Sequence, residues 1–186
     1  MRNVLLEQFP DLWSRFFLQP GLIVSLILLE RHPGVQRQNL YLFLRPKQVA
    51  YMSHRPGVEL RGEHGLWTSG GKVENLAEAV REVAEHPGNV WTPVVAIRRQ
   101  DAERLGYDNA ENWRALVNAC LCDIAKGYKI HPDHLRWYAA FHEKEKSVHI
   151  HMVIFSTDPK EGYLTKDGIQ QLSLIHISEP TRRSYI

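Results

Sequence analysis

The sequence has little cysteine, no long apolar run and little net charge, and each scarcity excludes a class of protein. Its only cysteines are Cys120 and Cys122. Residues two apart do not face each other on a helix, so we expect no disulfide and a reducing, cytoplasmic compartment. The longest apolar run, 21–29, is about half the length of a membrane-spanning helix. Glu7 and Pro10 interrupt any secretory signal, so no membrane insertion is expected.

The charge and the length point instead to an ordinary globular domain. A net charge of +2 is too small to indicate a nucleic-acid partner by itself, so a polyanion would have to bind a local patch. There is no internal repeat. With 186 residues, of which 44% are hydrophobic and 24% charged, the chain is large enough to bury one core.

Both ends depart from the pattern of the middle. Residues 172–182 match an in-frame translation of a transposase-type sequencing-library adapter. We therefore interpret 172–186 as a read-through segment that is not native, and we expect the natural chain to continue past Gln171. Residues 1–45 are an uncertain N-terminal segment, which holds either a first strand at 22–29 or a misread frame.

The middle of the chain predicts alternating helices and strands. Apolar residues at helical spacing predict helices over 47–53, 73–84 and 109–126, and from Thr165 onward. Strands are predicted at 90–97, 135–141 and 148–155. Pro93 indicates that the first of these is an edge strand or has a bulge. The stretch 62–72 contains four glycines and is interpreted as a loop.

A short polar loop joins the last two strands, and strands joined in this way pair antiparallel. The predicted fold class is therefore α+β, an antiparallel β-sheet with helices packed against it.

Three histidines gather around this hairpin. His149 and His151 are two apart on a strand, so both imidazoles leave the same face. The hairpin brings His142, at the end of the preceding strand, near this pair. Three nitrogen ligands that leave coordination positions open are typical of a catalytic metal rather than a structural one. The alternative is a histidine cluster on a solvated sheet face.

A nucleophile is harder to identify from the residues. Among seven tyrosines, Tyr51 precedes the basic segment 53–55. A phenol needs activation to react near neutral pH, and Arg55 and Arg61 would supply positive potential. The same sequence pattern is equally consistent with a Tyr51 that only packs against the protein from an amphipathic helix.

These residues resemble a known family. The segment 48–59, QVAYMSHRPGVE, resembles the first motif of MobP-type relaxases, which are mobilisation nucleases of the histidine-hydrophobe-histidine (HUH) endonuclease superfamily. Residues 88–107 look like the second motif. Residues 135–151 look like the third motif, and 158–165 extend it. The resemblance covers about 47–171, with the motifs in the family's order.

The resemblance implies an HUH relaxase-like fold and an enzyme with a covalent mechanism. Residues 46–171 would be a truncated catalytic domain that nicks transfer-origin DNA site- and strand-specifically, in the conjugation or mobilisation of a plasmid or integrative element. Tyr51 takes the place of the catalytic tyrosine, whose phenolate attacks phosphorus and keeps the 5′ end as a phosphotyrosine. His142, His149 and His151 take the places of the metal triad, and Mg²⁺ or Mn²⁺ is the expected divalent metal.

The implied partners are single-stranded DNA at the origin of transfer and the accessory and coupling proteins of a relaxosome. The candidate DNA-binding residues are Arg55, Arg98 and Arg99, the last two within the second motif. Trp67 and Trp91 either stack on bases or fill the core.

Two other classes of function stay open. One is a non-catalytic nucleic-acid-binding remnant of this fold, and the other is a three-histidine metallohydrolase that uses water as its nucleophile. Glu59, Glu143 and His54 are candidate general bases, and the sequence favours none of them.

Overall fold

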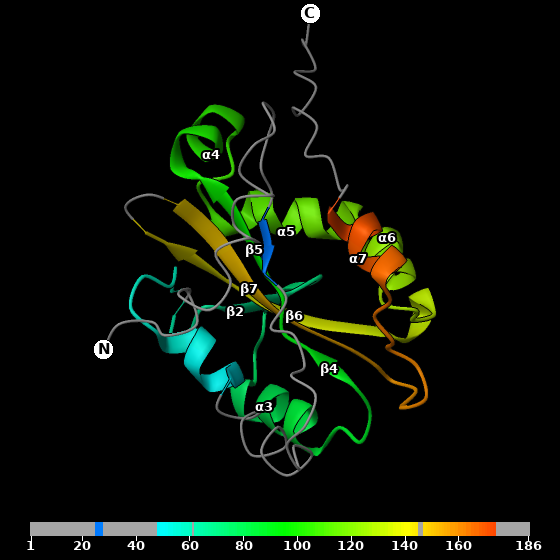
Figure 1. The fold of residues 1–186 in the computed structure, drawn as a ribbon. Helices are drawn as coiled ribbons and strands as arrows, with labels where there is room; N and C mark the ends of the chain where they lie inside the picture. The colour runs from blue at the N-terminus through cyan, green and yellow to red at the C-terminus, as the bar shows by residue number, and fades with distance from the viewer. Residues whose placement is uncertain (1–24, 28–47, 61, 145–146, 174–186) are drawn as a thin grey trace, which may run out of the picture.

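The computed structural model describes residues 25–27, 48–60, 62–144 and 147–173 (Figure 1). Within these ranges an antiparallel sheet carries helices on both faces, so the predicted α+β class is confirmed. No helix in the described ranges has both the length and the apolar character needed to cross a bilayer.

The sheet is built around one long hairpin. Its strands are β1 Ser25–Ile27, β2 Leu66–Thr68, β3 Gly71–Lys72, β4 Val90–Trp91, β5 Val94–Arg98, β6 Leu135–Glu143 and β7 Ser147–Ser156. The strand order is β1–β5–β7–β6–β2–β3, and β4 pairs with the end of β7. Strand β1 falls inside the predicted strand 22–29, and the rest of that prediction lies outside the described residues.

The helices follow most of the predicted spacing. They are α3 Leu76–Glu85, α4 Arg99–Leu105, α5 Ala110–Ala119, α6 Leu121–Gly127 and α7 Lys166–Ser173, with a 3₁₀ turn η2 at Pro132–His134 and a helix over 48–54. The predicted helix over 109–126 is two helices, because the chain leaves helical geometry at Cys120. Asn109 begins the first of them, since its side chain accepts the Asn112 amide at 2.9 Å.

Two predictions of local structure need correction. The glycine-rich stretch 62–72 is not a loop, because β2 and β3 form a short hairpin there that extends the sheet beside β6. The predicted strand 90–97 is interrupted at Pro93, which has no amide hydrogen to donate to a neighbouring strand. Its carbonyl still accepts the Met152 amide at 2.9 Å. Strand β5 lies between β1 and β7, so it is not an edge strand.

Alternation along β6 and β7 divides the core into two layers. On one face, α5, α6 and α7 cover a cluster that includes Trp113, Trp137, Phe141, Ile150 and Ile154. On the other face, the helix 48–54 and α3 cover a smaller cluster of Val49, Met52, Leu66, Ala79, Val83, Ala140, Val153 and Phe155. Figure 1 shows these two groups of helices on opposite sides of the sheet.

The two tryptophans that the sequence left open, Trp67 and Trp91, differ in burial. Trp67 is 3% exposed and packs edge-on against Trp137, so it is a core residue and not a platform for bases. Trp91 is half-buried, and its indole N–H donates to the Gly162 carbonyl at 2.8 Å.

The last described helix begins where the sequence predicts. The Thr165 hydroxyl oxygen accepts the Gly168 amide at 3.1 Å. Helix α7 includes the first two residues of the predicted read-through segment, and Leu172 is buried where it packs against Gly127. The remainder of that segment, 174–186, lies outside the described residues.

Gly57 turns the chain from the helix 48–54 onto the edge of β6. Its φ of +88° is in the left-handed region, and a Cβ there would lie 2.8 Å from the Glu143 carbonyl oxygen. The Glu143 amide donates to the Gly57 carbonyl at 2.8 Å, and Val58 forms a bridge with His142. This turn holds the helix beside the end of β6.

We expect Gly57→Ala to lower the free energy of unfolding by about 1–2 kcal/mol, because alanine is strained at this φ and its Cβ would press on Glu143. Denaturant titration measures the change. Gly70→Ala is the matched control, since nothing lies within 4 Å of its would-be Cβ. Equal stability of the two variants would contradict this account of the turn.

Candidate active site

The register of β6 and β7 brings the three predicted histidines together. His142 is directly opposite His149, and His151 is opposite Ala140. All three side chains therefore leave the face that carries the smaller core cluster. The ring centroids are 5.4 Å apart for His142 and His149, 4.8 Å for His142 and His151, and 5.2 Å for His149 and His151.

Burial keeps these imidazoles neutral. It is the largest cause that lowers the pKa of His142 and of His149 to about 3, and that of His151 to about 4. The charge of Arg55 lowers the pKa of all three further. His151 also opposes the protonation of His142 and of His149. Near pH 7 the cluster is therefore a set of uncharged nitrogen donors.

His142 is the most deeply enclosed of the three. It is 1% exposed, and neither of its ring nitrogens makes a hydrogen bond. An interaction with the Met52 backbone opposes part of the pKa shift of His142, but it does not have the distance and angle of a hydrogen bond. Buried polar atoms without partners cost stability, so their presence in a folded protein calls for a functional explanation.

Tyr51 stands beside this cluster on the helix 48–54. Its side chain is 60% exposed, which disfavours the alternative that it packs in the core. Arg55 follows four residues later on the same side of the helix, and its guanidinium carbon lies 5.2 Å from the centre of the Tyr51 ring. Arg55 Nη1 also donates to His151 Nε2 at 2.9 Å. The arginine thus connects the tyrosine to the histidines.

The other two predicted DNA-binding arginines, Arg98 and Arg99, lie in different surroundings. Arg98 pairs in register with Ser147 and shares the histidine face, where its exposed side chain contacts Asp101 at 2.9 Å. Arg99 begins α4 and forms an ion pair with Glu143 at 2.7 Å. It also lines an open pocket of about 410 Å³ together with Phe141 and Glu143, which leave β6 on the face opposite the histidines.

The three candidate general bases are engaged in contacts of their own. Glu59 accepts the Ala110 amide at the start of α5, at 3.0 Å. Glu143 pairs with Arg99, as described above. His54 Nδ1 lies 2.9 Å from the Ser53 hydroxyl oxygen. None of these contacts aims the residue at the histidine cluster.

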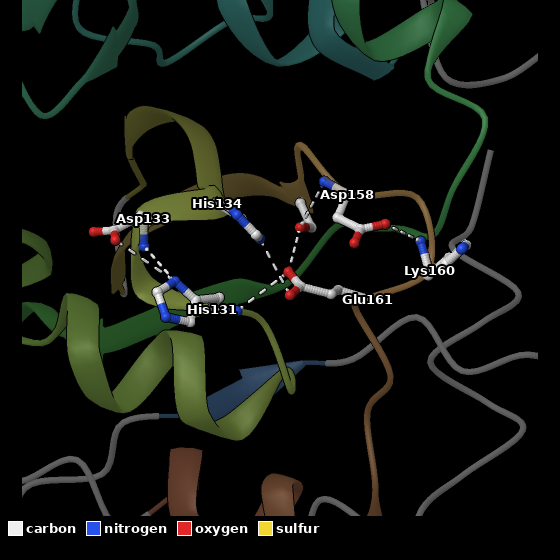
Figure 2. Close-up of polar contacts among 7 residues, drawn as sticks. His131, Asp133, His134, Asp158, Lys160 and Glu161 are labelled. Atoms are coloured by element: carbon white, nitrogen blue, oxygen red, sulfur yellow. Dashed lines mark hydrogen bonds and ion pairs between the residues drawn. The ribbon is translucent and has the colours of Figure 1, made fainter.

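A second group of histidines occupies the opposite end of the hairpin (Figure 2). Glu161 lies at its centre. His134 Nδ1 is 3.2 Å from Glu161 Oε1, and the Ser156 hydroxyl donates to Oε2 at 2.6 Å. The His131 amide also donates to Glu161, and these hydrogen bonds lower the pKa of its carboxyl. Because these contacts tie η2 to the loop after β7, we interpret this group as structural.

The donor set of the first cluster suits a divalent metal. Neutral imidazoles bind Mn²⁺ and Zn²⁺, and the buried nitrogens of His142 have no other partner. The positions of the rings do not by themselves form a metal site: within the part of the chain that the structure describes, no three His, Cys, Asp or Glu side chains are placed so that they could hold a metal. In addition, the hydrogen bond from Arg55 engages Nε2 of His151.

Sequence reasoning did not find the contact between Arg55 and His151. The four-residue spacing of Tyr51 and Arg55 indicates that these two side chains lie close together, because such residues share a helix face. His151 lies 96 residues further along the chain, and no local pattern connects it to Arg55.

Fold and site together define an α+β domain with a three-histidine cluster on its central hairpin and an exposed tyrosine beside it. A family model described as MobL relaxases matches residues 50–178, more than half of the chain, and the chain therefore belongs to the MobL relaxases. No curated protein and no solved structure matches. The predicted relaxase family is thus confirmed, and with it a role in mobilisation as a DNA-nicking enzyme; the MobP type stays a prediction.

The lowered pKa values predict a stability that depends on pH. A histidine whose folded pKa lies below its usual 6.5 binds its proton more readily in the unfolded chain, so its contribution is complete above about pH 6.5 and is lost toward pH 3–4. We expect the free energy of unfolding to fall by roughly 2 kcal/mol or more between about pH 7 and about pH 5.

Denaturant titrations at a series of pH values measure this slope. His142→Phe should reduce it, because one buried titrating ring is removed. His131→Gln, which changes an exposed ring in the other group, is the control and should leave the slope unchanged. A wild-type stability that is flat over this range would show that the cluster is hydrated and protonates normally.

Proposed function

We propose that the chain is a metal-dependent relaxase that nicks one strand of transfer-origin DNA through a covalent tyrosine intermediate. The observation that carries the proposal is the contact chain from Tyr51 through Arg55 to His151, because it places an exposed phenol beside three neutral imidazoles. The family match supports the DNA-nicking part of this statement.

In the proposed reaction, the Tyr51 oxygen attacks the scissile phosphorus in line. The bond from phosphorus to the 3′ oxygen breaks, and that oxygen leaves as a 3′-hydroxyl after taking up a proton. The 5′ phosphate stays on the tyrosine as a phosphodiester. One phosphodiester replaces another, so a 3′-hydroxyl can reverse the step without a nucleotide cofactor.

His142, His149 and His151 would hold the divalent metal, for which Mg²⁺ or Mn²⁺ is proposed. The metal supplies positive charge that neutralises and orients the scissile phosphate. Three nitrogen donors suit Mn²⁺ better than Mg²⁺, which prefers oxygen. The residues themselves contribute an exposed tyrosine and three uncharged imidazoles, of which His142 and His149 are buried.

The DNA partner would lie across the face that carries the cluster. Arg98 is exposed at the rim of this face and is suited to a phosphate contact. Arg99 is held by Glu143, so it would act on the strand only near the hairpin tip. The DNA that is mobilised is proposed to be a plasmid or an integrative element. The proposed protein partners are the accessory and coupling proteins of a relaxosome. Within the relaxases, a MobP-type relationship is proposed.

The test is a trapping assay with 3′-labelled single-stranded oligonucleotides that tile the transfer origin, in the presence of Mn²⁺. A nicking relaxase transfers label to the protein, where it survives denaturing electrophoresis. We expect Tyr51→Phe to abolish this adduct. Tyr163→Phe is the matched control, because Tyr163 is similarly exposed, at 57%, but lies away from the cluster.

Other outcomes point to the alternatives. Cleavage by the unmodified protein without an adduct would overturn the proposal and favour a metallohydrolase that uses water. Binding without cleavage would favour a non-catalytic remnant of the fold.

The histidines have a separate prediction. His149→Ala combined with His151→Ala should lower the nicking rate by about 10²-fold or more, because the charge stabilisation of the phosphate is lost. Binding of the same oligonucleotide, measured by fluorescence anisotropy, should change little. An equal loss of nicking and binding would mean that the histidines support the fold rather than the chemistry.

A further inference from the structure

Arg55 does more than add positive charge near the site. Its Nη1 donates to His151 Nε2 at 2.9 Å, while its guanidinium carbon lies 5.2 Å from the centre of the Tyr51 ring. Its amide donates to the Tyr51 carbonyl at 3.0 Å, so the backbone of Arg55 is fixed at the end of the helix 48–54. The side chain therefore reaches across the cluster from a defined anchor.

The bond to His151 uses the electrons that a metal would need. A guanidinium has only donors, so Nε2 of His151 must be the acceptor and must be unprotonated. An imidazole nitrogen has one lone pair in the plane of the ring, and coordination uses that same pair. Arg55 and a metal ion cannot both occupy Nε2 of His151.

We propose that Arg55 is a latch on the histidine cluster: it occupies His151 in the metal-free protein, and a divalent cation must displace it in order to bind. This inference rests on the proposed metal-binding role of the three histidines. It assigns Arg55 as a positioning residue and adds to the DNA contact expected from the sequence.

Electrostatics makes the exclusion stronger than the shared lone pair alone. A guanidinium stays charged at every physiological pH, and the cluster is buried, so a second cation among the same rings is repelled at short range. The positive charge of Arg55 already opposes protonation of all three histidines. A dication entering the cluster meets the same opposition until the arginine leaves.

Displacement leaves the guanidinium beside the nucleophile. The anchor at the end of the helix keeps Arg55 near Tyr51, and a phenolate or a phosphate oxygen is a better acceptor for a freed guanidinium than an aromatic face. Metal loading and the placement of positive charge at the tyrosine would thus occur together. The latch links the two halves of the proposed site.

The test measures metal affinity in the absence of DNA, so it does not depend on activity. Mn²⁺ is titrated into the full chain at pH 7 and the free ion is counted by electron paramagnetic resonance. Arg55→Met removes both the donor and the charge but keeps much of the side-chain length. We expect it to bind Mn²⁺ about tenfold more tightly than the wild type, which corresponds to a net gain of about 1.4 kcal/mol.

Two controls isolate the latch. Arg98→Met removes one positive charge from an exposed position on the same face, and we expect its affinity to stay within about twofold of the wild type. In a His151→Ala background the acceptor is gone, so Arg55→Met should tighten binding clearly less than it does in the wild type, through the effect of charge alone. Circular dichroism and the thermal midpoint without metal show that each variant is folded.

The outcomes separate this inference from the proposed function. If folded Arg55→Met and wild type bind Mn²⁺ equally, or if the variant binds more weakly, the latch is overturned and the metal site stands. If Arg55→Met and Arg98→Met tighten binding equally, the effect is general charge and the latch is again overturned. If no folded variant binds Mn²⁺, the metal-dependent function fails together with the latch. Tighter binding by Arg55→Met and not by Arg98→Met, clearly reduced in the His151→Ala background, supports the latch.

Discussion

The pairing register of β6 and β7 is the constraint on which the rest of the site depends. With His142 opposite His149, every side chain of the two strands is assigned to a face. A slip of one residue along either strand would move its histidines into the larger core and its apolar side chains out of it. Burial of the large core layer, which includes Phe141 and Ile150, therefore fixes the histidines on the other face of the sheet.

The second requirement is a helix that approaches this face from the edge of the sheet. The bridge between Val58 and His142 and the left-handed turn at Gly57 bring the helix 48–54 against the end of β6. Val49 and Met52 then bury the inner side of the helix, which leaves Tyr51 outside. Backbone geometry thus brings the tyrosine near the histidines, and the Arg55 side chain contacts both Tyr51 and His151.

The sequence predicts the hairpin, its alternation and the gathering of the histidines, because these follow from periodicity within one continuous stretch of chain. It also predicts that helices begin near Asn109 and Thr165, where the structure shows local capping hydrogen bonds. It misses the hairpin of β2 and β3, whose two- and three-residue strands are too short to show a period. It misses the bond of Arg55 to His151 for a different reason: the partners are distant in sequence and only the folded sheet brings them together.

The histidine face of β7 explains why the cluster is both costly and useful. Along this face the strand carries His149, His151, Val153 and Phe155, so the site continues directly from an apolar core layer. That continuity removes water, keeps the imidazoles neutral and strengthens any charge interaction placed among them. It also leaves the nitrogens of His142 without partners, a cost that a better-packed apolar residue would avoid. The proposed cation would offset this cost, because it would supply the partner that these nitrogens lack.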